Sequence, residues 1–407
     1  MSLSSSSMGF SAQFNGLVVE SLVAKSETAS SESLERSLAQ SRLELSDFAN
    51  LISPAAAQRL DALATRSAHL TRQRFGKVIR LFAPLYLSNE CINNCRYCGF
   101  SRDNAILRVT LSVEEVLREA RELKQQGFRN LLLVAGEHPK FVSIDYLREC
   151  VAALHPEIPG ISLEVGPLET DAYSGLVKAG AEGLVVYQET YDRRVYADMH
   201  TAGPKRDFDW RLETAERAYA AGFRRLGIGA LYGMSDWRWE AISLAAHAEY
   251  LLRHCWKAQL TISLPRLRPC AGEFDPPRPM SDRELVQLVC ALRIFLPDAG
   301  LVLSTREPAR LRNGLIPLGV TMMSAGSHTE PGGYTGAGRE HVHLTQRGRI
   351  VPLTESSSEW SAARTSGATG QFDIADERSP AEVANMIARL GLEPVWKDWD
   401  AALATSE

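Results

Sequence analysis

Three cysteines stand close together in the chain, at Cys91, Cys95 and Cys98, directly after the apolar run at 78–87. Three thiolates at this spacing can hold three irons of a cubane cluster, because such clusters take one Cys for each iron. The fourth iron then stays open for an outside ligand, much as a catalytic zinc keeps one position free. A structural zinc site would need a further ligand nearby, usually from a second Cys pair, and none follows. A disulfide framework does not suit a chain of 407 residues with seven Cys and no secretory signal.

Tyr97 places an aromatic side chain directly before the last of these cysteines, and we assign it to the cofactor site. With it, the motif resembles the signature of the radical S-adenosylmethionine (SAM) enzymes. The resemblance implies a [4Fe–4S] cluster whose open iron binds the amino and carboxylate groups of SAM. It also implies that one electron from the cluster cleaves SAM to methionine and a 5′-deoxyadenosyl radical, which is cofactor chemistry that the protein positions and shields.

The composition is that of an ordinary globular protein, with 45% hydrophobic and 23% charged residues. The net charge of −4 gives no indication of a nucleic-acid surface. No apolar run approaches the roughly 18 residues needed to cross a membrane. Reduced cysteines and an oxygen-sensitive cluster favour a cytoplasmic location.

Apolar strands alternate with amphipathic helices over most of the chain. Capping boxes at Ser112–Glu115 and Ser281–Glu284 mark two of the helix starts. We expect eight strands, at 78–86, 130–134, 161–165, 183–187, 225–229, 260–264, 300–304 and 319–323. This number and spacing predict an α/β fold of the (β/α)8 barrel type. A doubly wound open sheet is the alternative, but no Gly-x-Gly-x-x-Gly follows the first strand.

The chain divides into three parts on this interpretation. Residues 1–75 form an N-terminal arm, loosely ordered to residue 45, and a helical extension with two helices. Residues 76–334 form the barrel. Residues 335–407 form a C-terminal extension, which begins with a polar Gly/Ser/Arg-rich stretch at 335–380 that we expect to be a long mobile loop.

In such a barrel the active site lies where the strands end, so polar residues at those positions become candidates. The second strand ends in Ala135-Gly136-Glu137, which resembles the Gly-Gly-Glu element that holds the methionine amino group of SAM in the radical SAM family, with Ala in place of the first Gly. Gly136 has the alternative role of a simple turn residue.

Two carboxylates and one arginine are further candidates for binding SAM. Glu164 and Glu189 follow the third and fourth strands, where a carboxylate can accept hydrogen bonds from both ribose hydroxyls. Arg211 can pair with the SAM carboxylate through its planar fork. Loop ion pairs for the two glutamates, and a surface ion pair for Arg211, are the alternatives.

The other cysteines are mostly structural. Cys150 and Cys290 fall on apolar helix faces and are expected to fill the core, and Cys255 ends a helix. Cys270 follows the sixth strand at the catalytic face, so a functional role stays open for it.

A narrower resemblance rests on long uninterrupted sequence segments, from about residue 48 to 335 and again from about 380. They include LISPAA, LTRQRFG, PLYLSN, YCGFS, LLLVAGEH, VYQETY, LSTRE, PGGY and PVWKDWD. These segments resemble the 2-iminoacetate synthase family, the ThiH-type tyrosine lyases of thiamine biosynthesis. The resemblance implies that the radical takes a hydrogen atom from L-tyrosine, that the Cα–Cβ bond breaks, and that 2-iminoacetate and p-cresol form.

Partners follow from the same resemblance. A separate thiazole synthase would receive the imine, which hydrolyses readily in water, and an external flavodoxin- or ferredoxin-type donor would supply electrons. We expect the thiazole synthase to dock through the C-terminal region, with Trp396 and Trp399 as aromatic anchors. The alternative is that both tryptophans pack against the barrel.

An amino-acid substrate needs a cation for its carboxylate, and Arg306 at the end of the seventh strand is the best-placed candidate. Ser324 ends the eighth strand, and Tyr86 lies five residues before Cys91. Relatives in the aromatic-amino-acid lyase group hold substrate with residues at these three positions. An ion pair with Glu307 is the alternative for Arg306. The group that recognises the tyrosine hydroxyl stays open among His138, His200 and His328.

Three other functions deserve comparison. The related maturase that makes carbon monoxide and cyanide from tyrosine carries a second cluster on C-terminal cysteines, and this sequence has no Cys after Cys290. A related tryptophan lyase shares the core motifs. An iron–sulfur scaffold or electron carrier would not need Arg306, Glu137 or an open iron, and it would not cleave SAM.

Overall fold

Eight parallel strands close into a barrel, as the strand spacing predicts. The computed structural model describes residues 9–352, 365 and 367–396. The last barrel strand pairs with the first and completes the closure. The strands in order around the barrel are β1 (Val78–Ser88), β4 (Asn130–Ala135), β5 (Gly160–Glu164), β6 (Gly183–Val185), β8 (Arg225–Gly229), β9 (Gln259–Ser263), β10 (Gly300–Leu303) and β11 (Met322–Ser324). All eight predicted strands are present, although β11 begins three residues later than expected.

The strand sequences explain which side chains point inward. Alternate residues of a strand face opposite sides of a sheet. In β1, Leu81, Ala83 and Leu85 join the large apolar core outside the barrel. Phe82 and Tyr86, which are four residues apart and alternate with these, belong to a separate apolar cluster with inward-facing residues of β4. The period of two therefore carries Tyr86 into the barrel mouth.

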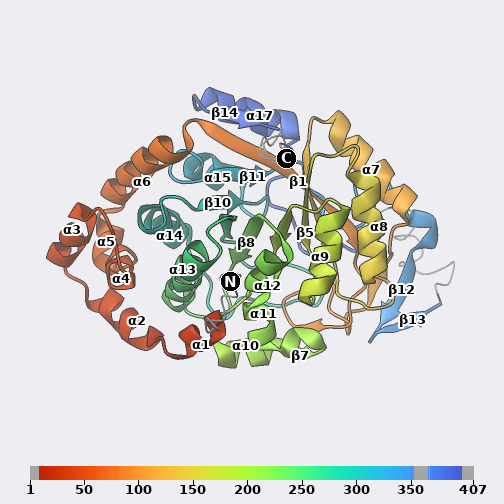
Figure 1. Cartoon of the computed structure of the whole chain (residues 1–407), viewed down its shortest axis with the longest axis horizontal. Helices are drawn as coiled ribbons and strands as arrows, with labels where there is room; N and C mark the ends of the chain where they lie inside the picture. Colours follow the sequence, from red (N-terminus) through yellow and green to blue (C-terminus); the bar gives the residue numbers. More distant parts are fainter. Residues whose placement is uncertain (1–8, 353–364, 366, 397–407) are drawn as a thin grey trace, which may run out of the picture.

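Helices surround the barrel and cover its outer face (Figure 1). Both predicted capping boxes form, at Ser112 with Glu115 and at Ser281 with Glu284. Cys150 and Cys290 are buried in the core between helices and strands, as expected for core fillers. The main helices are α7 (Val113–Gln125), α8 (Ile144–Leu154), α9 (Thr170–Ala179), α12 (Thr214–Ala221), α13 (Trp237–His254), α14 (Asp282–Phe295) and α15 (Ala309–Leu315).

The N-terminal region is more regular than the sequence suggested. The expectation of a loosely ordered arm before residue 45 is wrong for the described part, which forms three helices, and three helices rather than two follow before β1. They are α1 (Phe10–Asn15), α2 (Val19–Thr28), α3 (Ser31–Ala39), α4 (Leu45–Leu51), α5 (Pro54–Gln58) and α6 (Leu60–Phe75). They wrap the side of the barrel that α13 and α14 form (Figure 1). Packing holds the arm: Phe10 stacks on the His247 ring at 4.3 Å, and Leu34 is buried.

The C-terminal extension adds structure at two places. β12 (His343–Gln346) and β13 (Arg349–Val351) form a hairpin that pairs with β3 (Ile106–Arg108). The predicted long loop over 335–380 is therefore wrong for this hairpin, while residues 353–364 and 366 lie outside the described part. After α17 (Pro380–Arg389), β14 (Glu393–Val395) pairs with the start of β1. The division of the chain at residues 75 and 334 stays a prediction.

None of the helices in the described ranges is both long enough and apolar enough to cross a membrane.

Candidate active site

The three-cysteine segment follows directly after β1 and forms the centre of the barrel mouth. Cys95 lies in the short strand β2 (Asn94–Cys95), which pairs with β7 (His200–Ala202). Asn104 fixes the other side of the loop, because its amide donates to the carbonyl oxygens of Cys98 at 3.2 Å and Gly99 at 3.0 Å. The loop that carries the cysteines is thus held on one side by strand pairing and on the other by a side-chain amide.

The spacing of the sulfurs fits a cluster better than a single metal ion. The sulfurs of Cys91, Cys95 and Cys98 do not all lie within 4.8 Å of one another. Thiolates around one zinc would be about 3.8 Å apart, given Zn–S bonds of about 2.3 Å in a tetrahedron. Burial also raises the pKa of Cys95 and of Cys98, so both thiols stay protonated unless a metal compensates the thiolate charge. A donor set of three separated cysteines fits a cubane with one open iron.

Gly136 brings the end of β4 against the cysteine loop. Its backbone N–H donates to the Ser88 carbonyl at 3.0 Å. A side chain here would place Cβ 2.2 Å from the Glu90 carbonyl oxygen and 3.2 Å from Cys91 Cβ, so glycine is required for this close approach. Gly136 is therefore more than a turn residue, and its backbone lies beside Cys91, one of the three predicted cluster ligands. Its contact with SAM stays a prediction.

Glu137 is tied to the same loop. Its carboxylate accepts a 2.6 Å hydrogen bond from the Asn93 amide, and its carbonyl accepts from the backbone of Ile92 at 2.8 Å. Asn93 also accepts from the backbone N–H of Lys205 at 2.9 Å. The Glu137 side chain in this structure therefore orients the loop, and its role toward SAM stays a prediction.

Glu189 and Arg211 lie together, and a lysine that the sequence did not point to joins them. The Lys205 ammonium is 2.6 Å from a Glu189 carboxylate oxygen, and Arg211 approaches the same oxygen at 3.3 Å. Arg211 also donates to the Tyr187 carbonyl at 2.7 Å. Arg211 is 9% exposed, so the alternative of a surface ion pair is wrong.

Contact with the two cations shifts the pKa of Glu189. Burial would raise the pKa of Glu189, but Lys205 and Arg211 outweigh it and lower that pKa, so the carboxylate is ionised. Two cations then face one anion. The excess positive charge suits an anionic ligand group such as an amino-acid carboxylate. Glu189 itself has φ of 73°, the left-handed region that non-glycine residues rarely adopt, which marks a position fixed by its surroundings.

A pocket inside the barrel mouth gathers the residues predicted to hold the substrate. Tyr86, Glu164, Arg306 and Ser324 all line it. The Arg306 guanidinium lies 3.3 Å from the centre of the Phe372 ring. We call this cavity the upper pocket.

The neighbours of these residues decide between the alternatives raised by the sequence. Arg266 binds the Glu307 carboxylate, with one bond of 2.9 Å, and no carboxylate among the described residues lies within ion-pair distance of Arg306. The predicted alternative of an Arg306–Glu307 pair is therefore wrong. Ser324 Oγ accepts from the Thr305 backbone at 3.1 Å. That bond leaves the Ser324 hydroxyl proton for another acceptor.

Glu164 sits in the upper pocket with an altered acidity. Burial raises its pKa to about 7, and the negative charge of Glu189 adds to this while Arg306 opposes it. A carboxyl group that titrates near neutral pH can exchange a proton with a bound ligand. An ion pair with a loop residue, the alternative for Glu164, is absent among the described residues.

The three histidines considered for the phenol hydroxyl do not line the upper pocket. His200 accepts from the Tyr97 hydroxyl at 2.7 Å and donates to the Tyr196 carbonyl, and burial lowers its pKa to about 3. His328 pairs with Glu330 at 2.8 Å, and His138 accepts from nearby backbone N–H groups. Cys270 donates to the Tyr97 carbonyl at 3.3 Å, and burial raises its pKa to about 11, so it braces the loop as a thiol.

Residues 367–376, which we call the C-terminal strap, cross the barrel mouth and close the upper pocket from above. The Gln371 carbonyl accepts from Gly99 at 3.1 Å, and Gln371 N–H donates to the Thr329 carbonyl at 3.0 Å. Further along, Asp376 forms a buried ion pair with Arg312. Gln371 and Phe372 both line the upper pocket. No sequence pattern indicated these two residues, because the strap lies far along the chain in a segment without periodicity.

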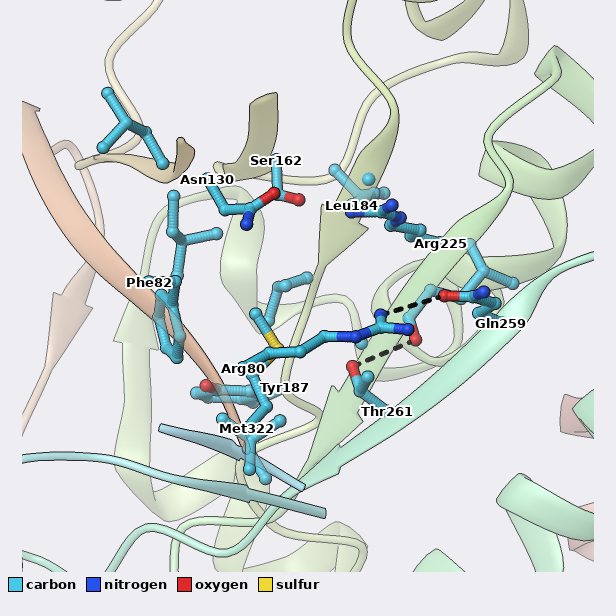
Figure 2. Close-up of a pocket in the computed structure, with 18 residues that line it drawn as sticks. Arg80, Phe82, Asn130, Ser162, Leu184, Tyr187, Arg225, Gln259, Thr261 and Met322 are labelled. Carbon is cyan, nitrogen blue, oxygen red and sulfur yellow. Dashed lines mark hydrogen bonds between the residues drawn. The ribbon is translucent and has the colours of Figure 1, made fainter. Parts of the chain in front are cut away.

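A second cavity lies deeper in the barrel, toward the start of the strands (Figure 2). The side chains that line both cavities form the boundary between them, and they are Phe82, Leu132, Tyr187, Ser263 and Val302. Arg80 reaches across the deeper cavity and donates to the Gln259 side chain at 3.4 Å (Figure 2). We call the residues shared by both cavities the aromatic boundary after Phe82 and Tyr187, and they separate the upper pocket from the deeper interior of the barrel.

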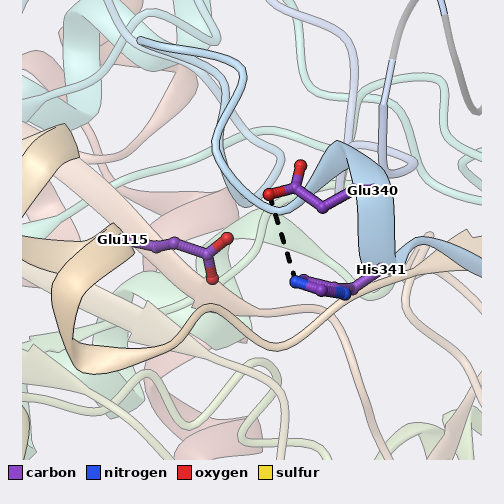
Figure 3. Close-up of side chains that lie close together, drawn as sticks. All are labelled: Glu115, Glu340 and His341. Atoms are coloured by element: carbon purple, nitrogen blue, oxygen red, sulfur yellow. Dashed lines mark ion pairs between the residues drawn. The ribbon is translucent and has the colours of Figure 1, made fainter.

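Another group of possible metal ligands, Glu115, Glu340 and His341, forms where the start of α7 meets the turn Arg339–His341 (Figure 3). Glu340 and His341 are 61% and 69% exposed, and Glu115 already accepts from the Ser112 backbone in the α7 capping box. Two of its members are exposed and the buried third is already bonded in the capping box, so this group is a weaker candidate cofactor site than the cysteines.

Comparison with known proteins agrees with this site. The chain matches the family model described as Radical SAM superfamily over residues 85–245 and the one described as Biotin and Thiamin Synthesis associated domain over 263–393. The fold and the three-cysteine site thus define a radical SAM enzyme.

Relatives narrow this class. The chain is 42% identical to 2-iminoacetate synthase of Escherichia coli (strain K12) over 371 residues, 91% of each protein. It therefore belongs to the 2-iminoacetate synthase family. Among solved structures it resembles HydG, a maturase of the [FeFe]-hydrogenase, with a TM-score of 0.83 and 30% identity over 95% of this chain and 81% of that one. Methylornithine synthase (PylB) shares the fold, with a TM-score of 0.66 and 19% identity over 89% of this chain and 97% of that one.

Proposed function

We propose that this protein cleaves the Cα–Cβ bond of L-tyrosine to give 2-iminoacetate and p-cresol, for the thiazole ring of thiamine. The observation that supports the proposal is the upper pocket, which Arg306, Tyr86 and Glu164 line, while Tyr86 shares an apolar cluster with Cys91 and Cys98. When bound, the cluster and SAM supply a 5′-deoxyadenosyl radical, which takes a hydrogen atom from the substrate amino group.

The residues of the chain bind and orient the substrate for that step. Arg306 binds the tyrosine carboxylate through its planar fork, which the Phe372 ring supports from one side. Tyr86 and Ser324 add hydrogen-bonding groups at the ends of β1 and β11. Glu164, whose pKa is raised to about 7, exchanges a proton with the amino group of the substrate. The amino group is then uncharged when it reacts. The strap and the aromatic boundary exclude water from above and below.

The atoms and electrons of the reaction balance with two electrons from outside. Removal of one hydrogen atom and cleavage of Cα–Cβ divide tyrosine into 2-iminoacetate and a hydroxybenzyl radical. One electron and one proton convert that radical to p-cresol, and another electron is used in cleaving SAM. A flavodoxin- or ferredoxin-type donor is therefore part of the proposal, and it suits a cytoplasmic enzyme.

A thiazole synthase is proposed as the protein that receives the product. The imine of 2-iminoacetate hydrolyses in water, so transfer between two proteins in contact avoids its loss. This part of the proposal rests on the chemistry of the product and on the family resemblance, and it does not assign a docking surface.

The test is anaerobic reconstitution of the full chain with iron and sulfide, followed by incubation with dithionite, SAM and tyrosine. We expect 5′-deoxyadenosine and p-cresol in matching amounts, and neither from a Cys95→Ala variant. Parallel reactions with tryptophan test the related lyase activity. Product from tryptophan in place of tyrosine would refute the substrate assignment, and a reconstituted cluster without any SAM cleavage would indicate an electron carrier.

A further inference from the structure

One side chain of the strap touches both the substrate pocket and a cluster ligand. The Tyr86 hydroxyl donates to Gln371 Oε1 at 2.8 Å. The other end of the same amide, Gln371 Nε2, donates to Cys98 Sγ at 3.8 Å, within the range of hydrogen bonds to sulfur. The amide therefore stands between Tyr86 and Cys98 with its acceptor directed to one and its donor to the other.

The position of this amide is fixed by the strap on both sides. A Cβ on Gly99 would lie 2.6 Å from the Gln371 carbonyl oxygen, so the strap packs against the cysteine loop as closely as glycine allows. The Thr329 hydroxyl donates to the Phe372 carbonyl at 2.9 Å on the other side. With the backbone held at Gly99 and Thr329, the side chain has little freedom to leave its two partners.

We propose that Gln371 is a positioning residue that couples tyrosine binding to the cluster by holding Tyr86 and donating to the sulfur of Cys98. The inference deepens the proposed function and rests on it for the identity of the substrate. The acceptor end fixes the ring of Tyr86 at the pocket wall. The donor end stabilises negative charge on the thiolate, which is greatest in the reduced cluster, and so makes the cluster easier to reduce.

The two ends can be separated by substitution. Gln371→Leu removes both hydrogen bonds at similar volume. Tyr86→Phe removes the hydroxyl bond alone and leaves the donor to Cys98 in place. Glu377→Gln is the matched control, because Glu377 follows the strap directly and its side chain is exposed.

Three quantities are measured on the anaerobically reconstituted full chain: the midpoint potential of the cluster without tyrosine, by electron paramagnetic resonance, and the dissociation constants of tyrosine and of SAM. For Gln371→Leu we expect a more negative potential, tyrosine bound about two- to tenfold more weakly, and SAM bound as before. For Tyr86→Phe we expect a similar loss for tyrosine with an unchanged potential. The double variant should bind tyrosine little worse than either single one, because the two share one contact.

The outcomes separate clearly. A potential for Gln371→Leu equal to that of Glu377→Gln would overturn the bond to Cys98. If the losses of tyrosine affinity in the two single variants multiply in the double variant, the coupling through Tyr86 is overturned. If Gln371→Leu does not retain iron, Gln371→Asn gives the same test, since its shorter side chain draws the amide back from the sulfur. Failure of the wild-type chain to make p-cresol would refute the proposed function, whereas the potential would still report on the bond to Cys98.

Discussion

Asp376 holds the C-terminal strap to the barrel, and its replacement by Asn should weaken the attachment of the strap over the upper pocket. Its carboxylate and the Arg312 guanidinium form an ion pair in which both side chains are 0% exposed. Arg378 adds hydrogen bonds of 2.8 and 2.6 Å to the two Asp376 oxygens. In Asp376→Asn the Arg312 charge stays buried without its counter-ion. Breaking a buried pair in this way costs about 3–5 kcal/mol.

The loss of unfolding free energy in Asp376→Asn should depend on pH in a direction set by the pKa shift of the Asp376 carboxyl group. Burial would raise the pKa of Asp376, but Arg378 and Arg312 outweigh it and hold that pKa below the usual 3.8. Stability from such a group is present above its unfolded pKa and is lost as pH falls through the folded one. The difference between wild type and Asp376→Asn should therefore be constant from about pH 5 to 8 and shrink only below 3.8.

The assay is urea unfolding of the reconstituted chain, followed by tyrosine binding, since the strap carries Gln371 and Phe372. Asp373→Asn is the matched control, because Asp373 is an exposed residue of the same strap. We expect weaker tyrosine binding in Asp376→Asn as well as lower stability. A stability loss below about 1 kcal/mol, no greater than that of the control, would contradict the reasoning about a buried charge.

Three further predictions concern the cofactor and the substrate. Cys95→Ala should lose the cluster and SAM cleavage while Cys290→Ala keeps its iron; the opposite pattern in an iron and sulfide assay would refute the ligand assignment. Arg306→Lys should weaken tyrosine binding about ten- to a hundredfold, with SAM binding nearly unchanged; equal losses in isothermal titrations would show that Arg306 does not act on tyrosine. The pKa of Glu164 is raised from 4.5 to about 7, so its stabilising contribution is lost as pH rises through that window. Glu164→Gln should therefore gain up to about 3 kcal/mol over wild type between pH 5 and 8; a gain independent of pH in urea unfolding would disprove the shift.

The parts of the fold that follow from local patterns could be predicted. The eight strands were found because each is a short apolar run between turn signals, and capping boxes located helix starts such as the one at Ser112. The cysteine motif was found for the same reason, since its spacing is a local property of the sequence. The side chains at strand ends, such as Tyr86 and Glu164, followed from the rule that barrel sites lie at the carboxyl ends of strands.

The parts that depend on distant contacts could not be predicted. Lys205 comes from the short helical turn Pro204–Arg206, which lies outside any barrel strand, and only the fold brings its ammonium to Glu189. Gln371 meets Tyr86 across 285 residues of sequence. The polar composition of the strap indicated a loop, and it gave no measure of how many backbone groups of the strap would find partners in the barrel mouth. The choice among the three histidines could not be narrowed from the sequence, because contacts such as that of His200 with Tyr97 depend on the fold.

The last prediction concerns the C-terminal segment, for which the sequence suggested a docking role. β14 pairs with Val78–Arg80 at the start of β1, whereas the cysteines follow its end at Ser88. Eight residues of extended chain between Arg80 and Ser88 span about 26 Å. β14 therefore lies at the end of the barrel opposite to the cysteines, and docking of a thiazole synthase through this segment stays a prediction. Trp399 lies outside the described residues.

Trp396 packs within the chain, which favours a structural role for it. Its ring centre is 5.1 Å from that of Phe128, and its carbonyl accepts from the Asn130 amide at 3.2 Å. Trp396→Ala should therefore lower the free energy of unfolding by about 1–3 kcal/mol, less than a fully buried tryptophan. Truncation after Leu390 should lower it further, because β14 is then lost as well. Co-purification with a thiazole synthase should be unaffected by Trp396→Ala, because the Trp396 side chain packs against Phe128. Loss of pairing in that variant at unchanged stability would show that the tryptophan serves the partner and that its packing against Phe128 contributes little.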